Sequence, residues 1–457
     1  MRRISDPQTT LQFQSTQIKP REQWEKMSEI LDANPEIAQA VHRDLCRRAE
    51  GKPTRNAGAK GVTADQVLRF ALVKVCEELS YRKLAERVDD SIILRAFCRI
   101  PFGPIPRFTT LRQNIKKLRS ETLERIHQLL IDYACRQGIE DGTRVRIDST
   151  AVESNIHHPT DARQLWDGVR VLTRILRQVE TDIERLQGRF HDHTRVAKKL
   201  LYKINNARGA NNRKPLYKRL IETARQSVGY AREAIEELAD TSRCPTFDEL
   251  MTAAALPNSL EQVTPLVERV IDQSVHRVLN GEKVPAEDKV VSIFEPHTDI
   301  IVKGQREIVY GHKVFLSGGV SNLILDCAIE RGNPADSEQF VPALERHMER
   351  FGEAPIDVAT DGGFTSKNNG KWAKAKGVAN VAFSTLKGNA LTELVQSKRV
   401  YKLLRKWRAG IEGIISVGKR AYGLTRCTWR SFASFQSYVR LAVIAFNLKT
   451  LAAHLLT

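Results

Sequence analysis

The sequence contains few of three features that would assign it to a particular class: paired cysteines, aromatic residues and long apolar runs. Its seven cysteines are scattered and none forms a C-x-x-C pair, so neither a disulfide framework nor a zinc ribbon is indicated. The basic N-terminus lacks the apolar core of a signal peptide. The most apolar late stretch, “VRLAVIAFNLKTLAAHLL”, contains Arg440, Asn447 and Lys449. We therefore expect a buried helix there rather than a membrane span, and a cytoplasmic protein.

What the chain does have is length and positive charge. Its 457 residues favour two or three domains. Lys plus Arg number 72 and Asp plus Glu 54, so the net charge is 72 − 54 = +18. A surplus of this size indicates a polyanionic partner, most often nucleic acid and sometimes an acidic membrane surface. A basic protein with no such partner is the alternative.

The first part of the chain reads as helical. Thr63 and Ser80 are placed to cap two successive helices, “TADQVLRFALVKVCEEL” and “SYRKLAERVDD”. Two helices joined by a short turn indicate a helix-turn-helix-like unit, and its candidate DNA contacts are Arg82, Lys83 and Arg87. The alternative is a helical hairpin with a charged outer face.

A long polar region, residues 155–285, has the 3.6-residue period of long helices and no comparable strand. Between residues 195 and 220 it carries nine Lys or Arg and no Asp or Glu. We call residues 195–220 the basic arm and expect it to contact the DNA backbone. Its alternative is a solvated tip of a helical hairpin. The candidate contacts are Lys198, Lys199, Lys203, Arg213 and Lys214.

Strand patterns precede and follow this helical region. “TRVRIDST” at 143–150 alternates, with Val145 and Ile147 inward and Arg144 and Arg146 outward, and we expect the strand to end at Asp148. Further strands are expected at 289–294, 312–320, 322–330, 355–361 and 378–383, and 312–320 with 322–330 should form an antiparallel hairpin. Helices are expected between and after the later strands, the first of them capped by Asp336 or Ser337. This order predicts an α/β fold with a mixed sheet flanked by helices.

Two acids occupy equivalent places in that sheet. Asp148 and Asp361 each stand at the carboxyl end of a largely apolar strand, where sites form in open α/β sheets. On neighbouring strands they would lie about 5 Å apart and repel each other unless a hard cation such as Mg²⁺ or Mn²⁺ bridged them. Taken singly, each is more often a turn-forming residue. Asp357, inside the strand, and Glu295 are weaker candidates. His157, His158, His312 and Lys313 could lie near the acids, but histidine matches a hard cation poorly, and we expect these four to be loop and strand residues.

A third acid, Glu412, lies in “RAGIEGIISVGKR” at 408–420, a helical segment interrupted by Gly413 and Gly418. Arg408 precedes Glu412 by four residues and Lys419 follows it by seven, so all three share a helix face. We interpret the two cations as phosphate contacts. Salt bridges to Glu412 are the alternative.

Together, “RIDST”, “ATDGGF” and “RAGIEGIISVGKR” resemble the three blocks of DDE transposases from bacterial insertion sequences. The third block of one large group reads Tyr, two residues, Arg, three residues, Glu, six residues, Lys or Arg. Arg408, Glu412 and Lys419 match this spacing, while Arg405 stands where Tyr is expected. “SYRKLAERVDDS” resembles the end-binding module of these transposases. The likeness covers most of the chain outside 160–285.

The resemblance implies an RNase H-like catalytic domain and metal-dependent phosphoryl transfer on DNA. Two Mg²⁺ or Mn²⁺ ions would be held by Asp148, Asp361 and Glu412, with Asp148 serving both. The implied partners are terminal inverted repeats and target DNA, bound by a dimer or larger homo-oligomer on the nucleoid, with no membrane. A domesticated DNA-binding protein without catalysis and an RNase H-like nuclease without joining activity are the alternatives.

These observations predict four parts. They are an N-terminal helical region, a DNA-end-binding domain, a catalytic domain in two segments, and a helical insertion after the first strand. Their boundaries are 1–60, 61–140, 141–158 with 286–457, and 159–285.

Overall fold

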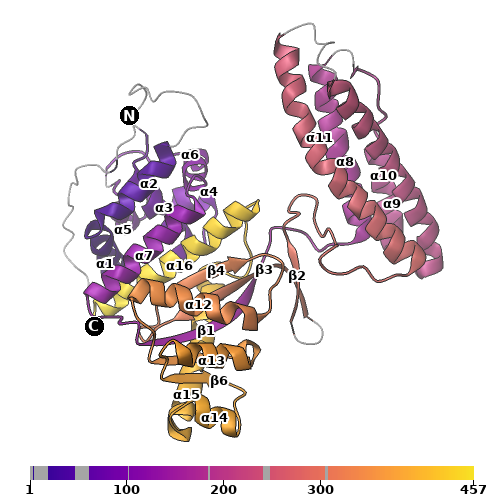
Figure 1. Cartoon of the computed structure of the whole chain (residues 1–457). Helices are drawn as coiled ribbons and strands as arrows, with labels where there is room; N and C mark the ends of the chain where they lie inside the picture. The colour runs from indigo at the N-terminus through magenta and orange to yellow at the C-terminus, as the bar shows by residue number, and fades with distance from the viewer. Residues whose placement is uncertain are drawn as a thin grey trace. The chain divides into compact units, whose positions relative to one another are not determined.

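The computed structural model describes residue 4 and residues 19–46, 61–100, 102–183, 186–239, 247–303 and 307–457, without the side chains of 19, 20 and 247–257. The chain divides into two compact units. The first consists of residues 1–154 and 311–457, and the second of residues 155–310. Helices dominate, and they accompany one mixed sheet in the described part of the chain (Figure 1). The expected α/β fold class is confirmed.

The first unit begins with helices, as the sequence indicates. Two of the expected caps are present: Thr63 and Gln66 form a reciprocal capping box at α3, and the Ser80 hydroxyl accepts from the Lys83 N–H at 3.3 Å at the start of α4. The helices are α1 (Lys19–Asp32), α2 (Pro35–Cys46), α3 (Ala64–Cys76), α4 (Tyr81–Asp90), α5 (Ile92–Phe97), α6 (Phe108–Ile115) and α7 (Ser120–Arg136).

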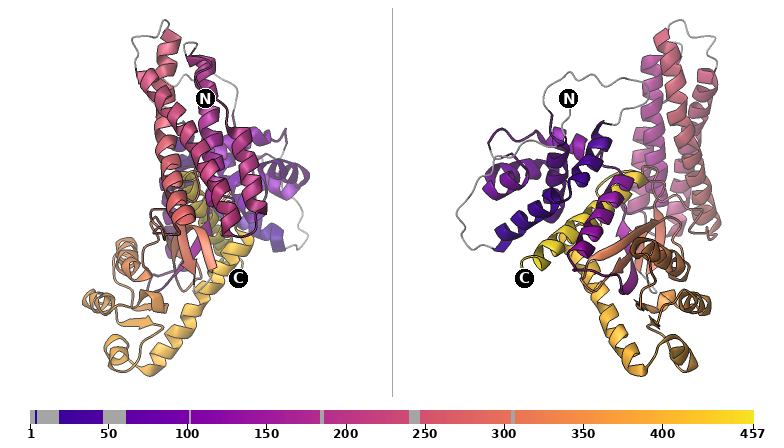
Figure 2. Two further views of the ribbon diagram at one scale, coloured as in Figure 1. Left: turned by 90° about the vertical axis from the view of Figure 1, so that its right-hand side faces the viewer. Right: turned by 60° about the vertical axis from the view of Figure 1, so that its left-hand side comes forward.

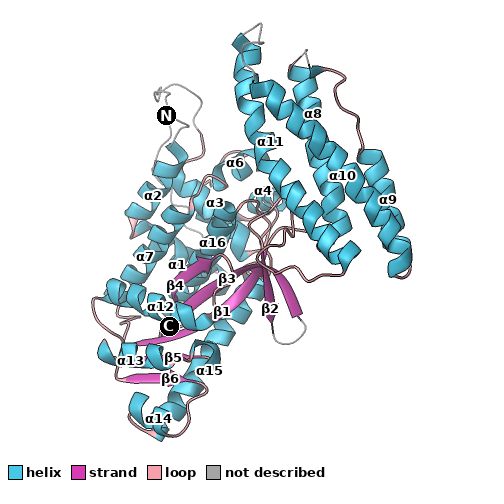
Figure 3. Ribbon diagram, turned by 45° about the vertical axis from the view of Figure 1, so that its right-hand side comes forward, coloured by secondary structure: helices cyan, strands magenta, loops and turns pink. Residues whose placement is uncertain are grey.

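The mixed sheet has the strand order β2-β3-β1-β5-β6, where β2 is Asp299–Lys303, and β4 also pairs with β3 (Figure 3). Strand β1 pairs antiparallel with β3 and parallel with β5, which pairs parallel with β6. Strands β3 and β4 form the expected antiparallel hairpin. The strands are β1 (Arg144–Glu153), β3 (Glu307–Gly318), β4 (Ile324–Glu330), β5 (Asp357–Thr360) and β6 (Asn380–Phe383). Strand β1 does not end at Asp148, because its pairing with β3 continues to Glu153.

Helices cover both faces of this sheet. Val145 and Ile147 pack into a core with Phe340 and Leu344 of α12, while α15 packs on β1, β5 and β6. The C-terminal elements are α12 (Asp336–Phe351), the short 3₁₀ helix η4 (Gly362–Phe364), α13 (Lys367–Ala375), α14 (Asn389–Leu394), α15 (Lys398–Ala421) and α16 (Phe432–His454).

Two local expectations about these helices are wrong. The cap of α12 is Ala335 rather than Asp336 or Ser337, and the Glu338 carboxylate accepts from the Ala335 N–H at 3.3 Å. Residues 398–421 form one continuous helix, so Gly413 and Gly418 do not interrupt it. Packing of its apolar face compensates the roughly 1 kcal/mol that each interior glycine costs.

Helix α16 is buried along most of its length, as its composition predicts. Its Asn447 side chain bonds both backbone groups of Ile324 in β4, at 2.9 and 2.7 Å. His127 of α7 bonds the same Ile324 carbonyl at 2.7 Å, so two helices are tied to the end of one strand. Among the described helices, none combines the length and apolarity of a membrane-spanning segment.

The second unit contains the expected helical insertion. Its long helices lie side by side in both views of Figure 2. They are α8 (Asp161–Asp182), α9 (Thr194–Asn206), α10 (Ala210–Ala239) and α11 (Phe247–Ser274), followed by the π-helical turn η3 (Val275–Asn280) and strand β2 (Asp299–Lys303).

The strand expected at 289–294 is absent from the described structure. Val290 and Ile293 are buried in the core of the helical bundle, which explains their apolar character. Their backbone N–H groups donate to the side chains of Gln273 and Gln164, at 2.9 and 3.3 Å, instead of to a neighbouring strand. The four-part domain division stays a prediction.

Candidate functional site

Asp148 and Asp361 lie on neighbouring parallel strands. Ile147 and Thr360 are the last residues paired between β1 and β5, and the two aspartates follow them directly. Beyond this point β1 stays paired with β3, where Asp148 lies opposite Leu316. Both aspartates therefore lie at the point where β1 and β5 separate, next to each other in the sheet.

Asp361 also forms the turn that follows its strand. Its carboxylate accepts a hydrogen bond from the N–H of Gly363 at the start of η4. Phe364 at the end of this turn is fully buried and packs edge-on against Phe315, with ring centroids 6.3 Å apart. The turn-forming role and the ligand role are therefore compatible, because the buried Phe364 anchors the turn and holds the carboxylate at the strand end.

Glu412 reaches this area from α15. The Arg408 guanidinium lies 3.4 Å from the Asp148 carboxylate and is also hydrogen-bonded to Glu412. The salt bridge to Glu412 that the sequence left as an alternative is thus present. A phosphate contact by Arg408 stays a prediction, as does one by Lys419, which lies half-buried two turns beyond Glu412.

The three acids influence one another electrostatically. Burial raises the pKa of Asp148 to about 6, and the charges of Asp361 and Glu412 act in the same direction. The Ser149 N–H, which donates to Asp148 at 2.8 Å, and the Arg408 charge oppose this rise. Asp148 is therefore a carboxylate whose negative charge is poorly compensated.

These donors suit a hard divalent cation in chemistry, since all three supply carboxylate oxygens. In the described residues, however, no three His, Cys, Asp or Glu side chains converge tightly enough to enclose a metal ion. The positive charge next to Asp148 and Glu412 is that of Arg408. The residues fit a divalent ion, provided that Arg408 yields its place beside the two carboxylates.

Three residues near this site were not singled out from the sequence. The Tyr401 hydroxyl lies 2.9, 3.1 and 3.3 Å from the carbonyl oxygens of Phe383, Ser384 and Leu386, at the end of β6. Tyr401 precedes Arg405 by one helical turn, so α15 has a tyrosine–strand contact although the expected position carries arginine.

The other two are Arg146 of β1 and Gly410 of α15, which faces the Arg146 guanidinium. Arg146 was expected to point outward, but it is only 2% exposed and lies against α15. The alternating pattern of β1 shows which residues share a face. It does not show that a helix more than 250 residues later covers that face.

The acids and histidines considered as rivals have structural partners. Asp357 is buried and bonds Arg144 and Asn380 at 2.9 and 2.8 Å. Glu295 is buried next to His297 at 2.8 Å. His312 packs edge-on between two phenylalanines, His157 lies 3.2 Å from Asp167, His158 stacks edge-on against Tyr310, and Lys313 pairs with Asp336 at 3.0 Å.

The predicted contacts on α4 differ in what they touch. Arg87 pairs with Glu77 at 2.8 Å, the Arg82 guanidinium lies 5.0 Å from the ring centre of Phe108, and Lys83 is exposed. The neighbouring segment 107–119, which includes α6, was not predicted to bind. It carries five cations and no acid, and its exposed residues include Arg107, Thr109, Arg112, Gln113 and Lys117.

The basic arm forms α9 and the start of α10, joined by a short turn at 207–209. Its nine cations are all exposed, and in the described residues none has an ion pair with an acid. Arg213 and Lys214 bond backbone carbonyls, those of Ala207 at 2.9 Å and Leu279 at 3.2 Å. Tyr202, 71% exposed, lies among the lysines of α9. The geometry is that of a hairpin tip, which leaves the DNA contact a prediction.

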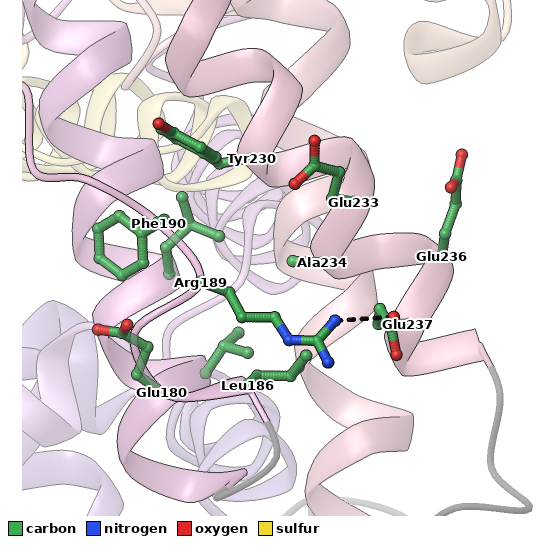
Figure 4. Close-up of a pocket in the computed structure, with 11 residues that line it drawn as sticks. Glu180, Leu186, Arg189, Phe190, Tyr230, Glu233, Ala234, Glu236 and Glu237 are labelled. Carbon is green, nitrogen blue, oxygen red and sulfur yellow. Dashed lines mark hydrogen bonds and ion pairs between the residues drawn. The ribbon is translucent and has the colours of Figure 1, made fainter.

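A cavity of about 440 Å³ lies within the second unit, and none of the basic arm's cations lines it (Figure 4). Phe190 and Tyr230 form part of its wall, and Arg189 is paired with Glu237 at 2.9 Å. Four glutamates and one arginine line it, so its charge disfavours phosphate. It contributes none of the candidate acids.

Comparison with known families gives two matches. A family described as Transposase DDE domain matches residues 305–448, and a family described as Transposase domain (DUF772) matches residues 13–117. No curated protein and no solved structure matches the chain. The first match contains Asp361 and Glu412, while Asp148 lies outside it and joins them through the pairing of β1 with β5.

Proposed function

We infer the roles of individual residues from the premise that this chain is a DDE transposase of an insertion sequence. Such an enzyme binds DNA, depends on divalent metal ions, and cuts and joins DNA strands by phosphoryl transfer. The match to the Transposase DDE domain bears out the resemblance, and neither family match favours a non-catalytic DNA-binding protein.

We propose that Asp148, Asp361 and Glu412 form the reaction centre. The observation that carries this proposal is the parallel pairing of β1 with β5, which ends at Ile147 and Thr360 and leaves Asp148 and Asp361 adjacent. Its support from electrostatics is the raised pKa of Asp148, to which burial and then the charges of Asp361 and Glu412 contribute.

The metal ions are proposed to be two Mg²⁺ or Mn²⁺ ions held by these three carboxylates. When bound, they would lower the pKa of an attacking water or 3′-hydroxyl and stabilise the leaving oxygen. The protein's contribution is to hold the three oxygens on rigid elements, two strand ends and one long helix. Arg408 pairs with Asp148 and Glu412 before metal and DNA bind, and it would then be available to a DNA phosphate.

DNA contacts outside the reaction centre are proposed on three surfaces. Lys419 would hold a phosphate next to the acids. Exposed residues of the N-terminal helices would bind the element's ends, and the basic arm would bind the DNA backbone. The residues are Arg82, Lys83, Arg87 and Arg112 in the first unit, and Lys198, Lys199, Lys203, Arg213 and Lys214 in the basic arm.

A homodimer or larger assembly is proposed because a transposition event joins two ends, each of which needs a reaction centre. The bacterial nucleoid is the proposed location, since the substrate is there. The ability to join strands, and not only to hydrolyse them, would separate this enzyme from a plain nuclease of the same fold.

The test replaces each acid by its amide and follows cleavage and joining of a duplex that carries the element's own terminal repeat. Asp148→Asn, Asp361→Asn and Glu412→Gln should each lower the rate by about 10³-fold or more, because each removes a ligand worth several kcal/mol of transition-state stabilisation. Binding of the end duplex should survive.

The matched control is Asp357→Asn, which changes an acid on the same strand as Asp361 that bonds Arg144 and Asn380 instead. Its cleavage rate per folded molecule should stay near that of the unaltered protein. Wild-type joining by any of the three amide variants would refute the proposed centre.

A further inference from the structure

A buried arginine lies on the same strand as the first acid of the proposed centre. Arg146 precedes Asp148 by two residues in β1, so both side chains project from the same face of the sheet. Arg146 is 2% exposed, and α15 packs against this strand. A cation at such a place needs several polar partners to remain buried.

Its partners come from two elements far apart in the sequence. One guanidinium nitrogen donates to the carbonyl of Trp407 in α15 at 2.9 Å, and the other donates to the Asn322 side chain at 2.5 Å. The guanidinium carbon also lies 4.9 Å from the ring centre of Trp407. In the described residues its hydrogen-bond acceptors are neutral, so these contacts fix direction rather than merely cancel charge.

The guanidinium fits against α15 because the helix carries a glycine, Gly410, at the point of contact. A Cβ atom at Gly410 would lie 2.1 Å from an Arg146 nitrogen and 2.9 Å from its guanidinium carbon. Gly413, one turn along the same helix, differs: a Cβ there would meet nothing within 4 Å. Gly410 therefore permits the contact between Arg146 and α15, while Gly413 has no such neighbour.

The contact connects the strand and the helix next to the reactive groups. Asp148 is about 7 Å along β1 from Arg146. Arg408 directly follows Trp407, and Glu412 lies one helical turn beyond Arg408. A slide or rotation of α15 on β1 would break the Arg146–Trp407 bond and would move Arg408 and Glu412 away from Asp148.

We propose that Arg146 is a positioning residue that sets the register of α15 on β1, and that Gly410 is the space its guanidinium requires. The pair holds Arg408 and Glu412 opposite Asp148 before DNA or metal arrives. Lysine cannot replace the arginine, because an ammonium group has neither the planar fork for two acceptors nor the face that stacks on Trp407. The inference rests on the proposed reaction centre.

The decisive variant is Gly410→Ala, with Gly413→Ala as its matched control. Alanine favours the helix at both positions, so Gly413→Ala should not lower the melting temperature. In Gly410→Ala this gain partly offsets the cost of displacing the buried Arg146 guanidinium. Gly410→Ala should reduce end cleavage by about 100-fold, the loss expected for a displacement of about 1 Å at a reaction centre. Gly413→Ala should cleave at the unaltered rate, and both should bind the end duplex normally.

A second readout does not depend on catalysis. Binding of Mn²⁺ to the DNA-free protein, followed by electron paramagnetic resonance, should weaken several-fold in Gly410→Ala and stay unchanged in Gly413→Ala. A role of Gly410 in folding alone would lower the amount of active protein and leave the Mn²⁺ affinity of the folded fraction unchanged.

The link to Arg146 is tested by a double-mutant cycle. Arg146→Ala should also cost about 100-fold, and Arg146→Lys should not restore activity. Because alanine at 410 then meets no guanidinium, the double variant Arg146→Ala with Gly410→Ala should be no worse than Arg146→Ala alone. Should Arg146→Ala not fold, the comparison of Gly410→Ala with Gly413→Ala decides.

Two results would overturn the proposal: equal cleavage and Mn²⁺ binding by the two glycine variants, or losses that multiply to about 10⁴-fold in the double variant. Asp148→Asn and Glu412→Gln are measured in parallel. If they lose cleavage while Gly410→Ala does not, only the positioning role fails. If they retain cleavage, the proposed centre itself fails.

Discussion

Asp148 shows how one residue's surroundings set its chemistry. Its strand leaves it partly buried, under the influence of two further carboxylates and one arginine, and this burial is the main cause that raises its pKa from 3.8 to about 6. A carboxylate at this place is ionised at neutral pH at a cost in stability. The same surroundings favour any cation that approaches it.

Asp148→Asn should therefore stabilise the metal-free protein. The folded pKa lies above the unfolded one, so the contribution of Asp148 to stability is present below pH 3.8 and is lost as pH rises through about 6. At pH 7.5 the asparagine variant should be more stable by about 1–3 kcal/mol. Urea unfolding in EDTA at pH 4.5 and pH 7.5 measures this gain. The prediction is contradicted if the stability difference between the variant and the unaltered protein is the same at both pH values.

Residue-level prediction from the sequence succeeded for local patterns and failed for distant contacts. The caps at Thr63 and Ser80 depend on the next few residues, and both are present. Arg146 was placed outward because its burial depends on α15. The contact of Tyr401 with the end of β6 likewise depends on an element that is distant in the sequence.

At the scale of elements, apolar runs gave the position of buried segments better than their type. The run at 289–294 is buried as expected, yet it packs in a helical bundle. Its backbone N–H groups donate to glutamine side chains rather than to a neighbouring strand. Periodicity cannot distinguish these two environments in so short a run. The strands that position Asp148 and Asp361 were predicted, because each carries its own apolar pattern.

Helix α7 is joined to the sheet through a histidine that should make stability depend on pH. Burial lowers the pKa of His127 to about 4, while its side chain bonds the Ile324 carbonyl. Its contribution to stability is complete above pH 6.5 and is lost as pH falls toward 4. His127→Gln keeps a hydrogen-bond donor but cannot titrate. Between pH 7 and pH 4 its free energy of unfolding should therefore fall by up to about 3 kcal/mol less than that of the unaltered protein.

Thermal melting of both proteins across this range measures the difference. Parallel pH profiles would show that His127 does not titrate with unfolding. His347→Gln offers a comparison, because burial also lowers the pKa of His347, which bonds the Gly142 carbonyl at 2.9 Å.

The basic arm should contribute to DNA affinity through its charge. Replacing Lys198, Lys199 and Lys203 of α9 by alanine should weaken end binding. It should also reduce the slope of log K against log salt by about 0.9 for each phosphate that the protein no longer neutralises. The measurement is a salt titration of binding to a labelled duplex.

The control for the arm removes three cations of the same unit that already have acidic partners. Arg177, Arg189 and Arg232 pair with Asp192, Glu237 and Glu268. Their replacement by alanine should leave the salt slope nearly unchanged. Equal slopes for the unaltered protein and the lysine variant would contradict the role of the arm.

At the scale of the whole molecule, the insertion separates the first acid from the other two. Asp148 belongs to a strand that precedes residues 155–310, while Asp361 and Glu412 follow them. The matched DDE region begins at residue 305 and so omits Asp148. The order of motifs along the chain suggested three acids of one site. It is the pairing of β1 with β5 that brings two of these acids, Asp148 and Asp361, next to each other.

Net charge, read from the sequence alone, indicated the class of binding partner. A surplus of +18 indicated nucleic acid, and the transposase matches agree with it. Charge could not locate the contacts, because cations on α4 are divided between ion pairs, aromatic contacts and solvent. The boundaries of the DNA-end-binding part remain a prediction for the same reason.

The central claim is that Asp148, brought to Asp361 by the strand pairing, binds the metal ion of the reaction. The most direct test is the ion preference of end cleavage by Asp148→Cys, because a thiolate binds softer ions better than Mg²⁺. We predict loss of cleavage in Mg²⁺ and its partial return in Mn²⁺, whereas Asp357→Cys shows no such switch. Normal cleavage by Asp148→Cys in Mg²⁺ would contradict the account.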